Sequence, residues 1–145
     1  MDKFTNQLKI AFASQYAFAI KAQNFHWNVE GIDFYQKHKM FQTIYEETYG
    51  AVDDFAENIR KIKAYTPASL YRFSALSAVD DEVEILDPQA MVAELLRDAE
   101  KMQEIMKLLF TEAENLGHHG LSNFLADRQD AFAKHAWFLR TTLKP

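Results

Sequence analysis

Helix-breaking residues are scarce in this chain, which has only four Gly and three Pro among 145 residues. Both residue types interrupt helices, so their scarcity over this length predicts long helices and few turns. Apolar side chains recur at spacings of three and four, as they do on a helix with one buried face. The pattern predicts four long helices, at about residues 5–29, 34–64, 87–117 and 121–143.

The segment between the second and third predicted helices, residues 68–87, is too long for a tight hairpin. Residues 69–73 can form a short helix there, and the acidic run at 80–82 indicates an exposed stretch. A connector of this length suits a crossover between two parallel helices. We therefore expect an all-α fold, a four-helix bundle with a short extra helix in the long connector, and a single domain over residues 1–145.

The composition restricts which sites and partners the chain can have. It contains no Cys, so any metal has to bind through His, Asp, Glu, backbone or water. No apolar run approaches the roughly 18 residues of a membrane span, and the N-terminus lacks a secretory signal, so we expect a cytoplasmic protein without a membrane partner. The net charge of −5, with 16 basic residues scattered among 21 acidic ones, argues against a nucleic-acid surface.

Polar residues follow one strip of the second predicted helix, displaced by roughly 70–130° from the centre of its apolar stripe. The members of this strip are His38, Gln42, Glu46, Asp53 and Glu57. Imidazole and carboxylate groups together suit iron that is to be oxidised. Asp53 and Glu57 share a face, where their charges repel each other and a cation would relieve the repulsion.

Some helical bundles hold two iron ions inside one subunit, through a Glu-x-x-His motif on each of two helices. None of the five His here has an acidic residue three positions before it; those positions hold Gln23, Tyr35, Asn115, Leu116 and Phe132. The candidate ligands, His26 included, come only from the first half of the chain. His26 and His38 come close only if the chain, or two chains, fold back at Gly31. A symmetric pair of subunits could bring two such halves together.

Two segments of the chain are similar to the signature of the Dps family of mini-ferritins. The late one is the segment Lys134-His135-Ala136-Trp137-Phe138-Leu139-Arg140. The early one contains Asn24-Phe25-His26-Trp27-Asn28-Val29-Glu30-Gly31, then Phe34, His38 and Phe41, then Tyr45, then Asp53 and Ala56-Glu57. The similarity covers nearly the whole chain, and the spacing from His-Trp to Glu57 is specific.

The resemblance implies a ferritin-like fold and a homo-oligomer, a hollow dodecamer with iron sites at its two-fold interfaces. His26 and His38 of one subunit would then act with Asp53 and Glu57 of its partner. Trp27 would lie beside the iron as an electron donor. Such proteins oxidise Fe²⁺ to Fe³⁺ with hydrogen peroxide or oxygen and store the ferric mineral, so this resemblance implies a ferroxidase that protects against oxidative damage.

The chain departs from the family pattern at two places. Gln42 stands where the family usually has Asp, and a neutral amide is a weaker iron ligand, so Glu46 one turn further on is a candidate replacement. Many relatives bind DNA through a Lys-rich tail, whereas this chain has only Lys3 and Lys9 near its start, so we do not expect DNA binding.

Two other functions remain open for this sequence. One is a Dps-like structural or binding shell whose iron site is weakened by Gln42; the retained Asp53 and Glu57 favour the enzyme over it. The other is a monomeric helical interaction module, which the many large apolar residues disfavour. Away from the strip, we expect His118 and His119 to be exposed in a loop and His135 to be packed.

Overall fold

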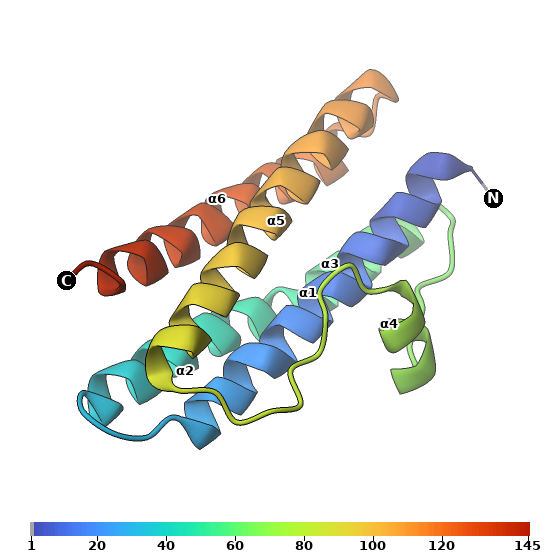
Figure 1. Ribbon diagram of the computed structural model, residues 1–145. Helices are drawn as coiled ribbons and strands as arrows, with labels where there is room; N and C mark the ends of the chain where they lie inside the picture. The colour runs from blue at the N-terminus through green and yellow to red at the C-terminus, as the bar shows by residue number, and fades with distance from the viewer. Residues whose placement is uncertain (1) are drawn as a thin grey trace.

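The computed structural model describes residues 2–145, which fold into six helices and contain no strand. Figure 1 shows their order along the chain. The helices are α1 (Lys3–Asn28), α2 (Phe34–Gly50), α3 (Val52–Lys61), α4 (Leu70–Leu76), α5 (Pro88–Asn115) and α6 (His119–Thr142). The expected all-α fold is therefore confirmed, including the short helix in the connector.

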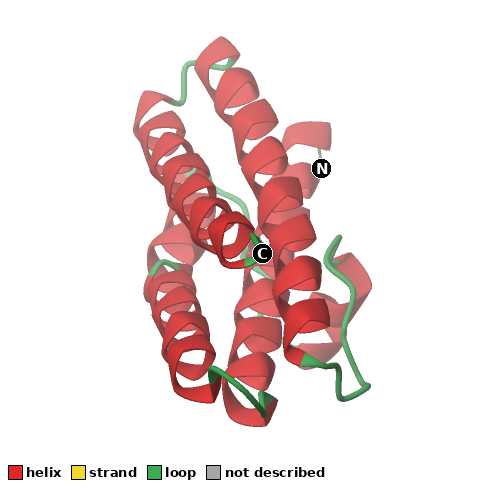
Figure 2. Cartoon of the chain, turned by 60° about the vertical axis from the view of Figure 1, so that its left-hand side comes forward, coloured by secondary structure: helices red, strands yellow, loops and turns green. Residues whose placement is uncertain are grey.

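The long helices form a bundle in which α1 packs against α2 and α5, and α5 packs along α6 (Figures 1 and 2). The short helix α4 lies against α1, and the chain then runs along the outside of α1 to reach the start of α5 (Figure 1). Helices α3 and α5 are thus joined by the long crossover that the length of the connector predicted. No helix among residues 2–145 combines the length and hydropathy that a bilayer crossing requires.

Aromatic side chains fill the centre of the bundle. Phe18, Phe25, Phe41, Phe55 and Phe132 are fully buried, and they come from α1, α2, α3 and α6. Truncating one such ring to Ala typically costs about 3–5 kcal/mol, because it leaves a cavity that the neighbours cannot fill. The core therefore holds the helices in fixed positions, from which their outer faces present polar groups.

Side-chain caps begin three of the helices. The carboxylates of Asp2 and Asp87 accept hydrogen bonds from the backbone N–H groups of Thr5 and Ala90, at 2.7 and 2.9 Å. The Ser69 hydroxyl accepts one from Arg72 at 3.1 Å in the same way. Each cap satisfies a backbone donor that has no partner within its helix.

The predicted second helix is interrupted, which corrects the expectation of one helix over residues 34–64. It breaks at Ala51, whose φ of −97° and ψ of −1° separate α2 from α3. Gly50 precedes the break, and Gly in a helix is disfavoured because of its large loss of backbone entropy. At the far end, Lys63 adopts φ 70°, and the N–H groups of Lys63 and Ala64 bond back to Arg60 and Ile59. This closure ends α3 at Lys61, before the predicted end.

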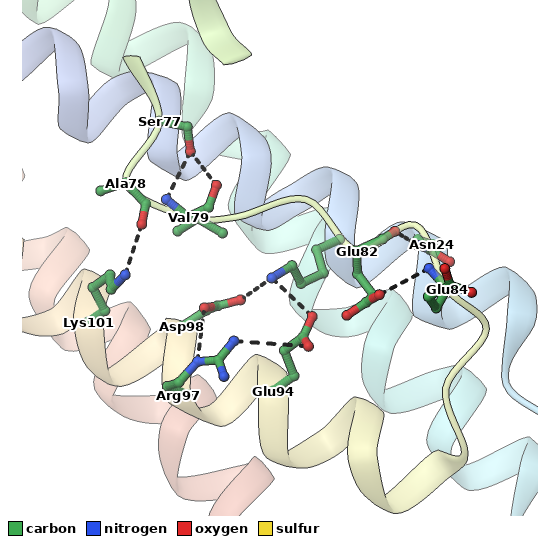
Figure 3. A network of polar contacts seen from close by, with 11 residues as sticks. Asn24, Ser77, Ala78, Val79, Glu82, Glu84, Glu94, Arg97, Asp98 and Lys101 are labelled. Atoms are coloured by element: carbon green, nitrogen blue, oxygen red, sulfur yellow. Dashed lines mark hydrogen bonds and ion pairs between the residues drawn. The ribbon is translucent and has the colours of Figure 1, made fainter. Parts of the chain in front are cut away.

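A polar network attaches the connector to α1 and α5 (Figure 3). The buried ammonium of Lys21 pairs with Asp98 at 2.7 Å and with Glu94 at 3.1 Å. Asn24 donates to the carbonyl of Glu82, and Lys101 donates to the carbonyl of Ala78. The connector therefore has a fixed course along α1, where it encloses a cleft of about 580 Å³ with Asp80, Asp81 and Glu82 in its lining.

A second polar cluster joins α1, α2 and α6 inside the bundle. The Arg128 guanidinium donates to both carboxylate oxygens of Glu47 and, at 3.1 Å, to the Gln15 amide oxygen. His135 lies 2.7 Å from the same carboxylate through Nε2 and is buried, as the sequence predicted for this residue. Burial acts to raise the pKa of Glu47, but the hydrogen bonds and charges of His135 and Arg128 outweigh it and lower the pKa to about 2.

Candidate metal site

Two histidines, from the end of α1 and the start of α2, stack on each other. The ring centroids of His26 and His38 are 3.8 Å apart and their planes differ by 17°. The chain folds back between them through Gly31 and Asp33, which have positive φ values of 101° and 64°. The expected return of the chain at Gly31 therefore takes place within one subunit, and it brings together two residues twelve positions apart.

Each histidine is held by the backbone of the other. The Nδ1 atom of His26 lies 2.8 Å from the carbonyl oxygen of His38, and the Nδ1 atom of His38 lies 2.7 Å from the carbonyl oxygen of His26. A carbonyl oxygen only accepts hydrogen bonds, so each Nδ1 carries the proton. In the neutral ring, Nε2 is then left with its lone pair available for a metal ion.

Aromatic and apolar side chains surround the histidine pair. Phe34 stacks on His38 at 5.1 Å, and the Tyr45 ring lies 5.2 Å from that of His26. His26 is buried, but Trp27 beside it is 66% exposed and Ile32 in the returning loop is 88% exposed. Two ligand candidates thus sit at an apolar surface that nothing covers in the single chain.

The next two members of the polar strip bind each other. The Gln42 amide donates to Glu46 Oε1 at 2.8 Å, one turn further along α2. Because this bond uses the amide nitrogen, the Gln42 carbonyl oxygen stays available as a weak metal ligand. Glu46 is exposed and carries the charge that Gln42 lacks.

Asp53 and Glu57 lie apart from the histidines, in the first two turns of α3, and both are exposed. Asp53 follows His38 by fifteen residues, which is about 22 Å along a helix. Ligands of one ion have to approach it to about 2 Å, so these carboxylates and the histidines of the same chain cannot share an ion. Accordingly, residues 2–145 hold no group of three or more His, Asp or Glu side chains that could hold a metal ion.

The other histidines have structural partners. His119 Nδ1 lies 2.6 Å from a carboxylate oxygen of Glu114, and His118 stacks on Phe4 with ring centroids 6.1 Å apart. His119 is exposed, but it begins α6 and so belongs to a helix rather than to the expected loop. His118 precedes that helix and is half-buried rather than exposed, because its ring packs on Phe4. Neither residue belongs to a group of three or more His, Asp or Glu side chains that could hold a metal ion within residues 2–145.

Sequence reasoning missed two features of the site region. The carbonyl groups that orient the histidines leave no signal in residue type, although the Gly31 return between the two residues was a clue. Glu47 was also missed, because it lies off the polar strip and its partners Arg128 and His135 are 81 and 88 positions away. Spacing within one helix cannot reveal such a pair.

Comparison with known proteins gives consistent matches over nearly the whole chain. A family model described as a ferritin-like domain matches residues 5–145. The chain is 30% identical to the DNA protection during starvation protein of Helicobacter pylori, covering 86% of this chain and 87% of that one. It is 29% identical to DNA protection during starvation protein 2 of Bacillus anthracis, covering 85% and 84%. The crystal structure of Dps from Staphylococcus aureus is similar with a TM-score of 0.93 at 25% identity, covering 98% and 95%.

Proposed function

The chain belongs to the Dps family of ferritin-like proteins, and from that premise we propose that it oxidises Fe²⁺ and stores the ferric product in a homo-oligomeric shell. Its sites would lie between paired subunits, with hydrogen peroxide as the favoured oxidant. The outcome for the cell would be the removal of iron and peroxide together, and thus protection from oxidative damage. The proposed shell is a dodecamer, and we do not expect it to bind DNA.

The observation that carries this proposal is the crossed pair of hydrogen bonds between His26 and His38. Metal-binding histidines characteristically donate their second ring N–H to a carbonyl or carboxylate, which fixes the tautomer and the ring orientation. Two adjacent histidines with this arrangement are ready to bind an ion before it arrives.

Antiparallel pairing of two copies would complete the site. If His38 of one copy lies opposite Asp53 and Glu57 of the other, the two-fold axis passes close to Glu46, at the middle of the polar strip. The symmetry then generates two equivalent sites per pair. Each site would contain two imidazoles from one subunit and two carboxylates from the other, so neither subunit could oxidise iron alone.

Exposed apolar side chains support pairing at this surface. Trp27, Ile32 and Tyr35 lie within ten residues of the histidine pair and are 66%, 88% and 63% exposed. Leu70 and Tyr71 on α4, which packs on α1, are each 79% exposed. An exposed surface of this kind characteristically marks a protein–protein interface.

The chemistry assigned to each residue follows from its charge. His26 and His38 would bind Fe²⁺ through neutral nitrogen, while the partner's Asp53 and Glu57 would supply the negative charge that favours the ferric product. Four protein ligands leave coordination positions open to the oxidant. Gln42 would contribute at most an amide oxygen, so a second ion would rely on Glu46. Trp27 would lie at the edge of the site as an electron donor.

Mixing two inactive variants tests the shared site directly. His26→Ala/His38→Ala and Asp53→Ala/Glu57→Ala should each assemble but oxidise Fe²⁺ no faster than buffer when peroxide is added. In a mixed pair, one site has all four ligands and the other has none, so unfolding and co-assembling the two variants should restore oxidation. His118→Ala/His119→Ala is the matched control and should keep wild-type activity, since it removes two histidines elsewhere.

Failure of the mixture to regain activity, with assembly intact, would overturn the interfacial site. The structural-shell alternative makes a different prediction for the same assay. A wild-type protein that assembles but leaves Fe²⁺ oxidation at the rate of buffer would favour that alternative, in which Gln42 has weakened the site.

A further inference from the structure

An open groove lies between the first turns of α2 and the last turns of α6. Its volume is about 490 Å³, and its lining includes Gln36, Lys39, Met40, Trp137, Phe138 and Thr142. Trp137 and Phe138 are 54% and 38% exposed, so the groove is open to solvent along α6. None of these residues is a proposed iron ligand, and the groove therefore has no part in the function argued so far.

Met40 in this groove differs from the other methionines within residues 2–145. Met91, Met102 and Met106 are at most 1% exposed and lie in the core of the bundle. Met40 packs against the edge of that core, but it is only half-buried and forms part of the groove wall. Because the oxidation of methionine follows its exposure, an oxidant dissolved in water reaches Met40 before the other three.

The surroundings of the Met40 sulfur leave its lone pairs free to react. Thr142 Oγ1 lies 3.4 Å from Met40 Sδ, and the same oxygen lies 2.7 Å from the carbonyl oxygen of Phe138. A hydroxyl has one hydrogen to donate, and a thioether is the weaker of these two acceptors, so the hydrogen goes to the Phe138 carbonyl. The sulfur therefore keeps the nucleophilic character of an unbonded thioether.

We propose that Met40 is a modification site at which hydrogen peroxide oxidises the thioether to methionine sulfoxide. The inference takes its oxidant from the proposed function, but its chemistry needs no iron. A sulfur lone pair attacks one peroxide oxygen, the O–O bond breaks and an S–O bond forms. The second oxygen leaves with its own hydrogen, takes up the hydrogen of the first oxygen and becomes water. Sulfur thus loses two electrons, and peroxide gains two.

This reaction gives the subunit a second way to consume peroxide. A single Fe²⁺ supplies one electron, whereas the Met40 sulfur supplies both electrons in one step and forms no radical. Each Met40 therefore removes one peroxide when no ferrous iron is bound. Sulfoxide reductases return methionine sulfoxide to the thioether, so the same site can be used again.

Oxidation changes the contact between α2 and the end of α6. The sulfoxide is polar, and its oxygen is a far better hydrogen-bond acceptor than the thioether that it replaces. Thr142 can then donate to the sulfoxide instead of to Phe138, which removes a hydrogen bond from the last turns of α6. Trp137 lines the same groove and lies 4.8 Å from the Phe138 ring, so its fluorescence reports the change.

Peptide mapping measures the oxidation of each methionine separately. Iron-free, assembled protein is incubated with hydrogen peroxide, the reaction is stopped with catalase, and mass spectrometry gives the sulfoxide fraction at each position. Met40 should be oxidised at least about tenfold faster than Met91, Met102 and Met106, because these three are enclosed in the core. In concentrated urea, where the core is exposed, the four rates should become similar.

Tryptophan fluorescence measures the effect of oxidation on the groove. The chain has two Trp, so the Trp27→Phe background leaves Trp137 as the only source of emission. Its emission should change at the rate at which the Met40 sulfoxide appears. Met40→Leu keeps an apolar side chain of similar size without the sulfur and should abolish the change. Met91→Leu is the matched control, since it makes the same substitution in the core, and it should leave the change in place.

Two results would overturn the modification site. One is a Met40 that is oxidised in the folded protein no faster than the three core methionines. The other is a Trp137 response to peroxide that persists undiminished in Met40→Leu. Because these experiments contain no iron, they are independent of the ferroxidase assay. Loss of the Met40 site leaves the proposed function intact, and ferrous oxidation no faster than buffer overturns the proposed function while the modification of Met40 stands.

Discussion

His26 and His38 each donate a ring N–H to the main-chain carbonyl of the other, at 2.8 and 2.7 Å, so each residue fixes the orientation of its neighbour. The two rings also stack on each other with centroids 3.8 Å apart, and this shared contact predicts non-additive effects on stability. His26→Ala and His38→Ala should each lower the free energy of unfolding of the iron-free protein by about 1–3 kcal/mol, from a lost hydrogen bond and lost packing. Urea denaturation at fixed protein concentration measures both.

The double variant should cost less than the sum of the two single changes, by about 0.5 kcal/mol or more, because each single change already removes the shared stacking contact. Additive losses would show that the two rings are held independently. In that case the stacking contact would contribute nothing to stability, and each ring would be held only by the main-chain carbonyl of the other residue, which both Ala variants keep.

The lowered pKa of Glu47 predicts how the stability of the protein changes in acid. Its pKa is about 2 in the folded protein, against an ordinary value of 4.5, because the hydrogen bonds and charges of His135 and Arg128 outweigh the effect of burial. The lowered pKa contributes stability that is fully present above about pH 5 and is lost as the pH falls toward 2, since the unfolded chain takes up the proton first. Glu47→Gln should remove this part of the pH dependence, and the urea midpoint of each protein measured from pH 6 to 2 checks it.

The contribution is modest, because the Glu47 side chain is 37% exposed and solvent screens its charge. The slope of stability against pH is the more informative quantity, as Glu47→Gln also weakens the contact with Arg128 at neutral pH. Parallel curves for the two proteins below pH 5 would mean that the ionised Glu47 gains nothing from Arg128 and His135.

How far the sequence predicts this structure depends on the range of the interaction. The four long helices follow from local periodicity, and the break at Gly31 predicted where the chain turns back. The break between α2 and α3 could not be predicted in the same way, because Ala51 is a good helix former. Only the neighbouring Gly50 indicated that the helix could end there. The clusters of Lys21 with Asp98 and of Glu47 with Arg128 join residues 77 and 81 positions apart, which no helical spacing encodes.

The candidate site shows the same limit more strongly. The ligand types and their strip on the second helix were visible in the sequence, and the structure places the two histidines together. Asp53 and Glu57 lie about 22 Å along the helix from them, so the proposed site would need a second copy of the chain. Its ligands and its completion between subunits stay predictions, because a single chain holds only half of such a site.

Lys21 on α1 forms a buried ion pair with Asp98 on α5. Its ammonium is 2% exposed and pairs with Asp98, which is 3% exposed, at 2.7 Å. Lys21→Ala should lower the free energy of unfolding by about 3–5 kcal/mol, because it leaves a buried carboxylate without its partner. Lys21→Met/Asp98→Leu should recover part of that loss, since the buried Asp98 charge leaves together with its partner and similar volumes remain, while Glu94 keeps Arg97 as a partner. Urea denaturation compares the three proteins, and a double variant as unstable as the single one would contradict this account.

Gly50 and Gly31 predict opposite outcomes for the same substitution. A Cβ at either position meets open space, with no atom within 4 Å, so the backbone alone decides. Gly50 ends α2 with an ordinary negative φ, and Gly50→Ala should raise the free energy of unfolding by about 0.5–1 kcal/mol, by lowering the entropy of the unfolded chain. Gly31 has a φ of 101°, a backbone conformation in which a residue with a side chain is strained. Gly31→Ala should therefore lower the free energy of unfolding by about 1–2 kcal/mol. Because Gly31 turns the chain between His26 and His38, that variant should also oxidise Fe²⁺ more slowly. Gly50→Ala, measured in the same assay, is the matched control. Equal effects at the two positions would show that backbone conformation does not govern either turn.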